Sequence, residues 1–194
     1  MARTFRPGGS IMPPTLSSRY DCPPGYRIRS GMPQDDERLV AVENAAGRLF
    51  AAHGYPQLAE DGFEDTAQLR STLSGGDMFV AVDAGDLPVG FASARALQDY
   101  LHLRELSVDP AHGRRGLGRA LVGAVIAAAQ GAGHRGVSLS TFRSVPFNQP
   151  FYESLGFREL APGDAPQVLV SAYQAEIPRG IDPAERVLMR YLLI

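Results

Sequence analysis

The sequence predicts a mixed α/β fold built around one strand, one glycine-rich turn and one helix. Apolar residues alternate at the start of 101–108, which is typical of a strand, and Pro110 cannot continue the hydrogen bonding of a sheet. Glycines follow at 113, 116 and 118, and apolar residues then recur at helical spacing from Leu117 to Ala128. Strand-like and helix-like segments alternate on both sides of this unit, so we expect a sheet flanked by helices.

The other elements are expected in chain order around this unit. A strand over 26–29 precedes a helix that opens at Pro33 and three acidic residues, because a helix N-terminus favours proline and negative charge. That helix runs to about Ala52, and a shorter one covers about 63–74. Gly85-Asp86 joins two hairpin strands, 78–82 and 89–96. The remaining elements are strands at 137–141, 157–160 and 186–193 and helices at 148–155 and 164–177.

Composition limits the class of protein. The 194 residues fit one domain, expected over 26–194, behind a flexible leader of residues 1–25 that is rich in proline, glycine and serine. The net charge of −2 argues against a nucleic-acid-binding protein, which usually carries a basic excess. A single cysteine, Cys22, excludes an internal disulfide and a cysteine-based zinc cluster, and it fits a reducing, cytoplasmic location. No membrane span is predicted, since no apolar run reaches about 18 residues.

The glycine-rich turn predicts an anion site. A helix that begins at such a turn presents free backbone N–H groups and the positive end of its dipole, and phosphate is the usual ligand. Glycine allows the backbone to approach that ligand closely. A dinucleotide site is disfavoured, because Leu121 stands where Gly-x-Gly-x-x-Gly needs its third glycine. The four histidines lack the spacing of metal ligands, and surface positions are expected for His53, His112 and His134.

Two segments resemble the GNAT superfamily of N-acetyltransferases. Its pyrophosphate loop reads Gln/Arg-x-x-Gly-x-Gly/Ala after a strand ending in Val-x-Pro, and here 108–118 reads Val-Asp-Pro-Ala-His-Gly-Arg-Arg-Gly-Leu-Gly, with Gly113 in place of the opening Gln/Arg. The stretch 151–157, Phe-Tyr-Glu-Ser-Leu-Gly-Phe, resembles the family's Phe-Tyr-x-x-x-Gly-Phe segment. The resemblance covers roughly 26–194. It implies a central, mostly antiparallel sheet that is splayed between strands 4 and 5 and flanked by helices.

The resemblance implies an acetyl-CoA-dependent enzyme without a metal. The acetyl group would pass to a primary amine by direct attack. Leu106 and Val108 would offer backbone groups to pantetheine, and the N–H of Leu106 or Ser107 would polarise the thioester carbonyl. Asn148 would hydrogen-bond the pantetheine arm or cap the following helix. The expected binding residues are Leu106, Ser107, Val108, Gly113, Arg114, Arg115, Gly116, Leu117, Gly118, Arg119, Asn148 and Tyr152.

Three residues are candidates for proton transfer. Tyr152 matches the family's tyrosine near the CoA sulfur and would protonate the leaving thiolate; otherwise it only packs against the cofactor. His102 and Glu105 are alternative general bases for the amine, and His102 could instead be a histidine satisfied within the sheet. Simple alternation puts these two side chains on opposite faces of the strand. A bulge, common in this family's central strand, would break that alternation and leaves both candidates open.

The acceptor is expected to be a small-molecule amine rather than a protein. The acidic stretch 60–65 would attract a cation, and 164–179 would border the same site. A homodimer is an expectation from the resemblance only. The competing hypothesis is a GNAT-fold module that binds an acyl-CoA without turnover, as a sensor or regulator.

Overall fold

A seven-stranded mixed sheet forms the centre of the molecule. The computed structural model describes residues 20–193. The strand order is β1-β2-β3-β4-β5-β7-β6, and every neighbouring pair is antiparallel except β4 and β5. The strands are β1 (Arg27–Ser30), β2 (Asp77–Val82), β3 (Pro88–Leu97), β4 (Tyr100–Val108), β5 (Gly136–Phe142), β6 (Arg158–Glu159) and β7 (Arg186–Leu192). The predicted mixed fold is confirmed.

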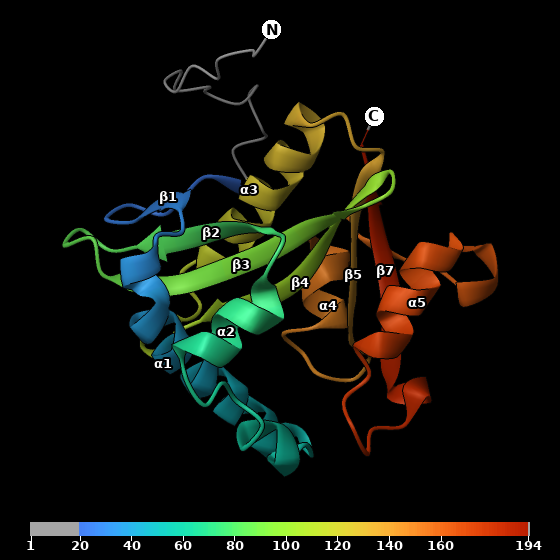
Figure 1. The fold of residues 1–194 in the computed structure, drawn as a ribbon, viewed down its shortest axis with the longest axis horizontal. Coiled ribbons are helices and arrows are strands. Elements are labelled where there is room, and N and C mark those ends of the chain that lie inside the picture. The colour runs from blue at the N-terminus through green and yellow to red at the C-terminus, as the bar shows by residue number, and fades with distance from the viewer. Residues whose placement is uncertain (1–19, 194) are drawn as a thin grey trace, which may run out of the picture.

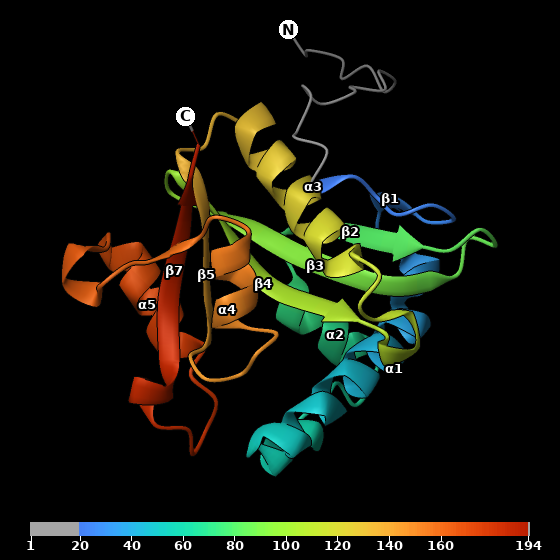
Figure 2. The same cartoon turned by 180° about the vertical axis from the view of Figure 1, so that it is seen from behind.

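Helices cover both faces of this sheet (Figures 1 and 2). The helices are α1 (Asp36–Gly47), α2 (Thr66–Leu73), α3 (Leu117–Gly131), α4 (Gln149–Ser154) and α5 (Gln167–Ala175). One face carries α3 and α4, and the opposite face carries α1, α2 and α5. No helix within residues 20–193 is long and apolar enough to cross a membrane.

The two faces have separate hydrophobic cores. On one face, the fully buried Leu121, Val125 and Ile126 of α3 pack on the sheet because they recur at helical spacing. On the other face, Leu39 and Val42 of α1 pack with the apolar side chains of α2, β2 and β3. Because both faces are covered, β3 is buried over most of its length.

A bulge and a separation of strands distinguish β4. Ser93 pairs with Glu105 and Ala94 pairs with Leu103, so Arg104 is an extra residue in β4. The parallel pairing of β4 with β5 spans only Tyr100–Leu103 and Gly136–Leu139. Beyond Leu103 the two strands diverge, and β5 continues to pair with β7 instead. The expected splay between strands 4 and 5 is therefore present, and it leaves one edge of 104–108 unpaired.

The segment before β1 is partly built into the fold. Residues 1–19 of the expected leader lie outside the described residues. Tyr20 is buried, packs against Gly123 of α3 and donates a hydrogen bond of 2.9 Å from its hydroxyl to the Leu155 carbonyl. Cys22 and Tyr26 also pack against this core. The buried ring of Tyr20 thus covers part of α3, whereas Asp21, Pro24 and Gly25 are exposed, and the expected domain boundary at residue 25 stays a prediction.

Candidate active site

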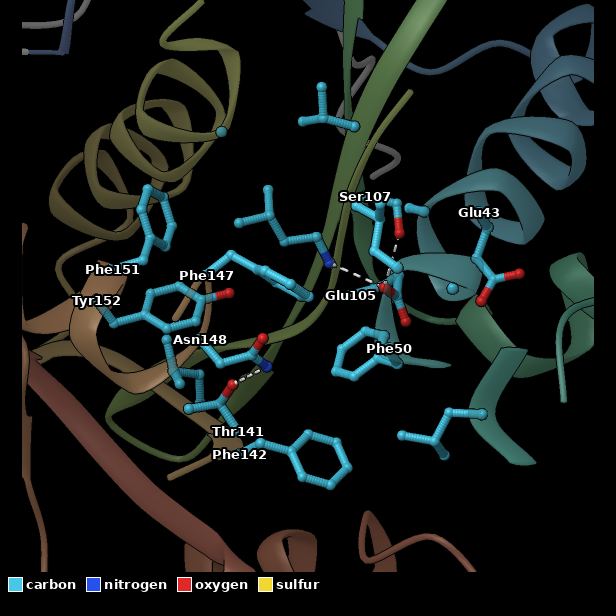
Figure 3. A pocket seen from close by; sticks show the side chains of 18 of the residues that line it. Glu43, Phe50, Glu105, Ser107, Thr141, Phe142, Phe147, Asn148, Phe151 and Tyr152 are labelled. Carbon is cyan, nitrogen blue, oxygen red and sulfur yellow. Dashed lines mark hydrogen bonds between the residues drawn. The ribbon is translucent and has the colours of Figure 1, made fainter. Parts of the chain in front are cut away.

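A cavity of about 950 Å³ lies where β4 and β5 separate. The open edge of β4 and the glycine-rich turn form one side, and β5 with the start of α4 forms another. The end of α1 and the 3-10 segment Arg48–His53 complete the wall (Figure 3). The divergence of two parallel strands thus creates the space, and the turn before α3 lies at one end of it.

The glycine-rich turn has the geometry of an anion site. Gly116 occupies the N-cap of α3 with φ of 92°, a left-handed conformation that side chains disfavour. No side chain caps this helix, so the first N–H groups of α3 remain available to a ligand. A Cβ at Gly116 would meet no atom within 4 Å, which shows that this position faces open space. Of the expected turn residues, the cavity lining includes Gly113, Arg114, Gly116, Leu117, Gly118 and Arg119.

Arg115 turns away from the cavity. Its guanidinium donates a 2.9 Å hydrogen bond to the Tyr26 hydroxyl, which also lies 2.9 Å from Nδ1 of His112. Arg115 is absent from the cavity lining, and the structure gives no support to its expected contact with phosphate. His53 is exposed, which confirms the expected surface position, and His112 is half-buried; both line the cavity.

The ladder between β3 and β4 decides which backbone groups face the cavity. The Asp109 N–H donates to the Val89 carbonyl over 2.9 Å. Because backbone groups of a strand alternate in direction, Ser107 faces β3, whereas Leu106 and Val108 face the open edge. The Leu106 N–H is directed at Oε1 of Glu105, 3.2 Å away. Leu106 and Val108 are thus available to a ligand at the open edge, and the Ser107 N–H is not.

Asn148 lines the opposite wall. Its side-chain amide donates a 2.6 Å hydrogen bond to Oγ1 of Thr141. Its Oδ1 is buried and has no hydrogen-bond partner among residues 20–193. The side chain does not cap α4. An unpaired buried carbonyl beside a cavity is a site for an N–H donor from a ligand.

Glu105 is the acidic residue of β4 at the cavity (Figure 3). Its Oε1 accepts hydrogen bonds from the Leu106 N–H and, over 3.1 Å, from the Ser107 hydroxyl. Burial and then the negative charge of Glu43 raise the pKa of Glu105 to about 7, against the opposing effect of these two hydrogen bonds. A carboxyl group with this pKa exchanges protons readily near neutral pH.

Tyr152 points its hydroxyl into the same space from α4 (Figure 3). The ring is held among aromatic side chains, with centroids 5.1 Å from Phe151 and 5.6 Å from Phe157. Burial, followed by the charge of Glu105, raises the pKa of Tyr152 well above that of a free phenol. The hydroxyl therefore stays protonated at neutral pH and can act as a proton donor.

His102 lies on the same face of the sheet as Glu105 but outside the cavity lining. The bulge at Arg104 breaks simple alternation and puts both side chains on one face, one of the two outcomes that the sequence left open. The imidazole is fully buried, with Nδ1 2.9 Å from Oγ of Ser138 and Nε2 2.9 Å from Oε1 of Glu176. Both ring nitrogens are therefore engaged within the protein. The geometry favours Glu105 over His102 as the group that meets a ligand.

Glu176 connects His102 to the cavity. Its second oxygen accepts a 2.9 Å hydrogen bond from the Ser140 hydroxyl, and that hydroxyl oxygen accepts one of 2.7 Å from Arg186. The Arg186 guanidinium also lies 4.5 Å from the centre of the Phe142 ring. Both Glu176 and Arg186 line the cavity. The chain His102–Glu176–Ser140–Arg186 forms its polar floor.

Several cavity residues carry no sequence motif and come together only through the fold. Glu176 falls within the stretch 164–179, and Asp61 is the member of the acidic stretch 60–65 that lines the cavity. Glu43 is a half-buried acid of α1 that the sequence analysis did not single out. The remaining residues that the sequence did not indicate are Phe50, Phe142, Phe147 and Arg186. Within residues 20–193, no three His, Cys, Asp or Glu side chains are arranged to hold a metal ion.

Solved acetyltransferases share this fold. An acetyltransferase of the GNAT family from Staphylococcus aureus Mu50 is 20% identical, with a TM-score of 0.61 over 87% of this chain and 99% of that chain. The ribosomal-protein-S18-alanine N-acetyltransferase from Escherichia coli is 21% identical, with a TM-score of 0.61 over 86% and 93%. The PaiA N-acetyltransferase from Thermoplasma acidophilum, solved in complex with coenzyme A, is 16% identical, with a TM-score of 0.61 over 87% and 99%.

The sequence itself matches the same family. Residues 74–159 match the model of the acetyltransferase (GNAT) domain. The matched segment contains β4, the glycine-rich turn, α3, β5 and α4, which are the elements that surround the cavity. The two comparisons agree: residues 74–159 match the acetyltransferase (GNAT) domain, and the fold of the chain is similar to that of solved acetyltransferases.

Proposed function

We propose that the protein transfers an acetyl group from acetyl-CoA to a primary amine. The observation that carries this proposal is the continuity of one cavity. It begins at the uncapped N-terminus of α3, follows the open edge of β4 and passes between Glu105 and Tyr152. An acyl donor with phosphates at one end and a thioester at the other fits such a path in one orientation.

The cavity provides a complementary group for each part of acetyl-CoA. The N–H groups at Gly116–Gly118, with Arg114 and Arg119 beside them, would hold the pyrophosphate. The open edge at Leu106 and Val108 would pair with the pantetheine arm as an added strand does. The unpaired Oδ1 of Asn148 would accept one of its amide N–H groups.

Two side chains would carry out the proton transfers of the reaction. Glu105 would take a proton from the incoming ammonium group, because only a neutral amine attacks the thioester carbonyl. The Leu106 N–H would exchange its bond to Glu105 for one to that carbonyl and so polarise it. Tyr152 would donate its proton to the departing thiolate. The nitrogen loses two protons when an ammonium becomes an amide. Glu105 would take the first and later release it to solvent. The second would return to the Tyr152 phenolate as the tetrahedral intermediate collapses and the carbon–sulfur bond breaks, so the products are the acetamide, the CoA thiol and one proton.

The competing function is acyl-CoA binding without turnover. It requires only the anion site and the open edge of β4. The raised pKa of Glu105 beside a protonated phenol favours the enzyme, because a binding module gains nothing from keeping two perturbed proton-transfer groups in one cavity.

The donor site is tested by calorimetric titration with acetyl-CoA. Gly116→Glu adds bulk and negative charge to the anion site and should abolish binding. Gly133→Glu is the matched control, because Gly133 also has a positive φ, of 74°, and open space at Cβ but follows the opposite end of α3. Binding retained by Gly133→Glu and lost by Gly116→Glu supports the site. Equal binding by both variants would refute it.

CoA release with a panel of amines then distinguishes the two functions. A thiol-reactive reagent follows the free CoA formed from acetyl-CoA. Release that depends on both an amine and the protein supports the transferase. Tight acetyl-CoA binding with no release for any amine would favour the binding module.

A further inference from the structure

The end of the cavity beyond the thioester position has two chemically different parts. One part is a pair of carboxylates, Glu43 and Glu105, and the other is a wall of aromatic side chains. We propose that the acceptor is an amphipathic monoamine, with one primary ammonium group on an aromatic or bulky apolar body. This inference rests on the proposed acetyl transfer and names the substrate class for it.

Within the part of the chain that the structure describes, the carboxylate pair accepts hydrogen bonds only from uncharged donors. Glu43 accepts a 3.2 Å hydrogen bond from the Phe63 N–H, and burial raises its pKa. Glu105 accepts its two hydrogen bonds from Leu106 and Ser107, which are uncharged donors. Within residues 20–193, neither carboxylate forms an ion pair with an arginine, lysine or histidine. Two neighbouring carboxylates of this kind favour a cationic ligand, which would relieve their mutual repulsion.

The third carboxylate at the cavity, Glu176, already has a hydrogen-bond partner on each of its oxygens. Glu176 is bound by His102 on one oxygen and by Ser140 on the other. The positive charge of Arg186, which is bonded to the same serine, acts on Glu176 as well. Arg186 and Arg104 also act on Glu105, but neither forms an ion pair with it. We therefore place the cation subsite at Glu43 and Glu105, which accept hydrogen bonds only from uncharged donors.

The aromatic wall lines the same cavity as this subsite. Phe50 and Glu105 are both among the lining residues that Figure 3 labels. Its ring centroid is 5.5 Å from that of Phe142 and 5.2 Å from that of Phe147. Phe147 remains 38% exposed, so part of its ring is uncovered by protein at the cavity. These rings offer an apolar surface to the body of the acceptor and, through their faces, a further attraction for its ammonium group.

The same wall disfavours acceptors that carry several charges. Beyond the carboxylate pair, the cavity is continued by Ala46, Leu49, Phe50 and Leu58. A second ammonium group placed among these side chains would lose its hydration without gaining a hydrogen-bond acceptor. Asp61 is the one other acid on this side, and it is exposed. A flexible diamine or a polycationic sugar therefore fits this subsite less well than an amine with an apolar body.

Three amines that differ in the size of their apolar body and in their number of ammonium groups test the inference. The probes are 2-phenylethylamine, n-propylamine and 1,4-diaminobutane, with CoA release from acetyl-CoA as the readout. We expect kcat/KM for 2-phenylethylamine to exceed that for each of the other two at least about tenfold, the scale of discrimination that an apolar pocket achieves. A value for 1,4-diaminobutane equal to or above that for 2-phenylethylamine would overturn the substrate class while leaving acetyl transfer intact.

Substitutions in the aromatic wall test whether its side chains cause the preference for 2-phenylethylamine. Phe50→Ala and Phe147→Ala should each lower the ratio of kcat/KM for 2-phenylethylamine to that for n-propylamine at least about threefold. Leu87→Ala is the control, because Leu87 is an exposed apolar residue outside the cavity lining and should not change the ratio. An unchanged ratio in both phenylalanine variants would refute the aromatic subsite. Release with none of the three amines would overturn the proposed function and this inference together.

Discussion

His102 Nε2 lies 2.9 Å from Glu176 Oε1, and the same imidazole is held through Nδ1 by Ser138. The contact directs the ring toward α5 and β5, away from the cavity. Because His102 is fully buried and Glu176 lines the cavity, the histidine fixes the orientation of a cavity carboxylate. The geometry thus favours a positioning role for His102, through Glu176, over direct contact with a ligand.

This position predicts the effect of His102→Ala. Removing a buried imidazole with two hydrogen bonds should lower the free energy of unfolding by about 2–4 kcal/mol. The rise of kcat/KM with pH should persist, because Glu105 remains in place. Urea denaturation and a pH–rate profile measure the two effects, and His134→Ala serves as a partly exposed control outside the cavity. A profile that loses its acidic limb in His102→Ala would show that the histidine is the base.

The pKa of Glu105 predicts the pH dependence of the reaction. A general base works in its deprotonated form, so kcat/KM should rise with pH and level off above the pKa of about 7. Glu105→Gln should remove this limb and lower kcat about 10²–10³-fold, within the range for loss of a general base. Its acetyl-CoA affinity, measured by calorimetry, should change little. Glu64→Gln removes an exposed acid elsewhere and should leave both quantities unchanged.

The elements of the fold were predictable because they depend on local signals. The helix after the glycine-rich turn follows from apolar residues at helical spacing, and Leu117–Gly131 is helical in the structure. The strand before it ends at Val108, two residues ahead of Pro110, as the missing N–H of proline requires. The hairpin at Gly85-Asp86 likewise forms where the turn residues indicated it.

The arrangement of the cavity was only partly predictable, because it depends on contacts between distant segments. One extra residue at Arg104 rotates the end of β4, so no count along the sequence determines the face of Glu105. Arg115 turns outward because Tyr26, 89 residues away, offers it a hydroxyl. Glu43 becomes significant only when α1 packs next to β4, and no pattern within α1 reveals that.

The raised pKa of Glu105 also predicts a cost in stability. A carboxyl whose pKa rises from 4.5 in the unfolded chain to about 7 in the folded one holds its proton more tightly when folded. The folded state therefore binds more protons between these values, and the free energy of unfolding falls as pH rises from about 4.5 to about 7.

Glu105→Gln should remove this cost, since the amide does not ionise. At pH values near 8 the variant should be more stable than the native protein by about 1–3 kcal/mol, and near pH values of 5 the two should be close. Urea denaturation at both pH values measures the difference. Glu64→Gln, at an exposed position, should show no such dependence on pH. A variant that is less stable than the native protein at high pH would contradict the assignment of a desolvated, like-charged carboxylate.

Tyr152→Phe separates proton donation from packing at the cavity. The Tyr152 hydroxyl forms no hydrogen bond with any residue in 20–193, so its removal should change the free energy of unfolding by less than about 1 kcal/mol. The ring contacts with Phe151 and Phe157 remain, and acetyl-CoA affinity should stay within about threefold. If the phenol protonates the leaving thiolate, kcat should nevertheless fall about 10²-fold, the lower end of the range for general acid catalysis. Phe151→Leu is the packing control beside it. Equal kcat in Tyr152→Phe and the native protein would assign the tyrosine to packing alone, and proton delivery to sulfur would then come from solvent.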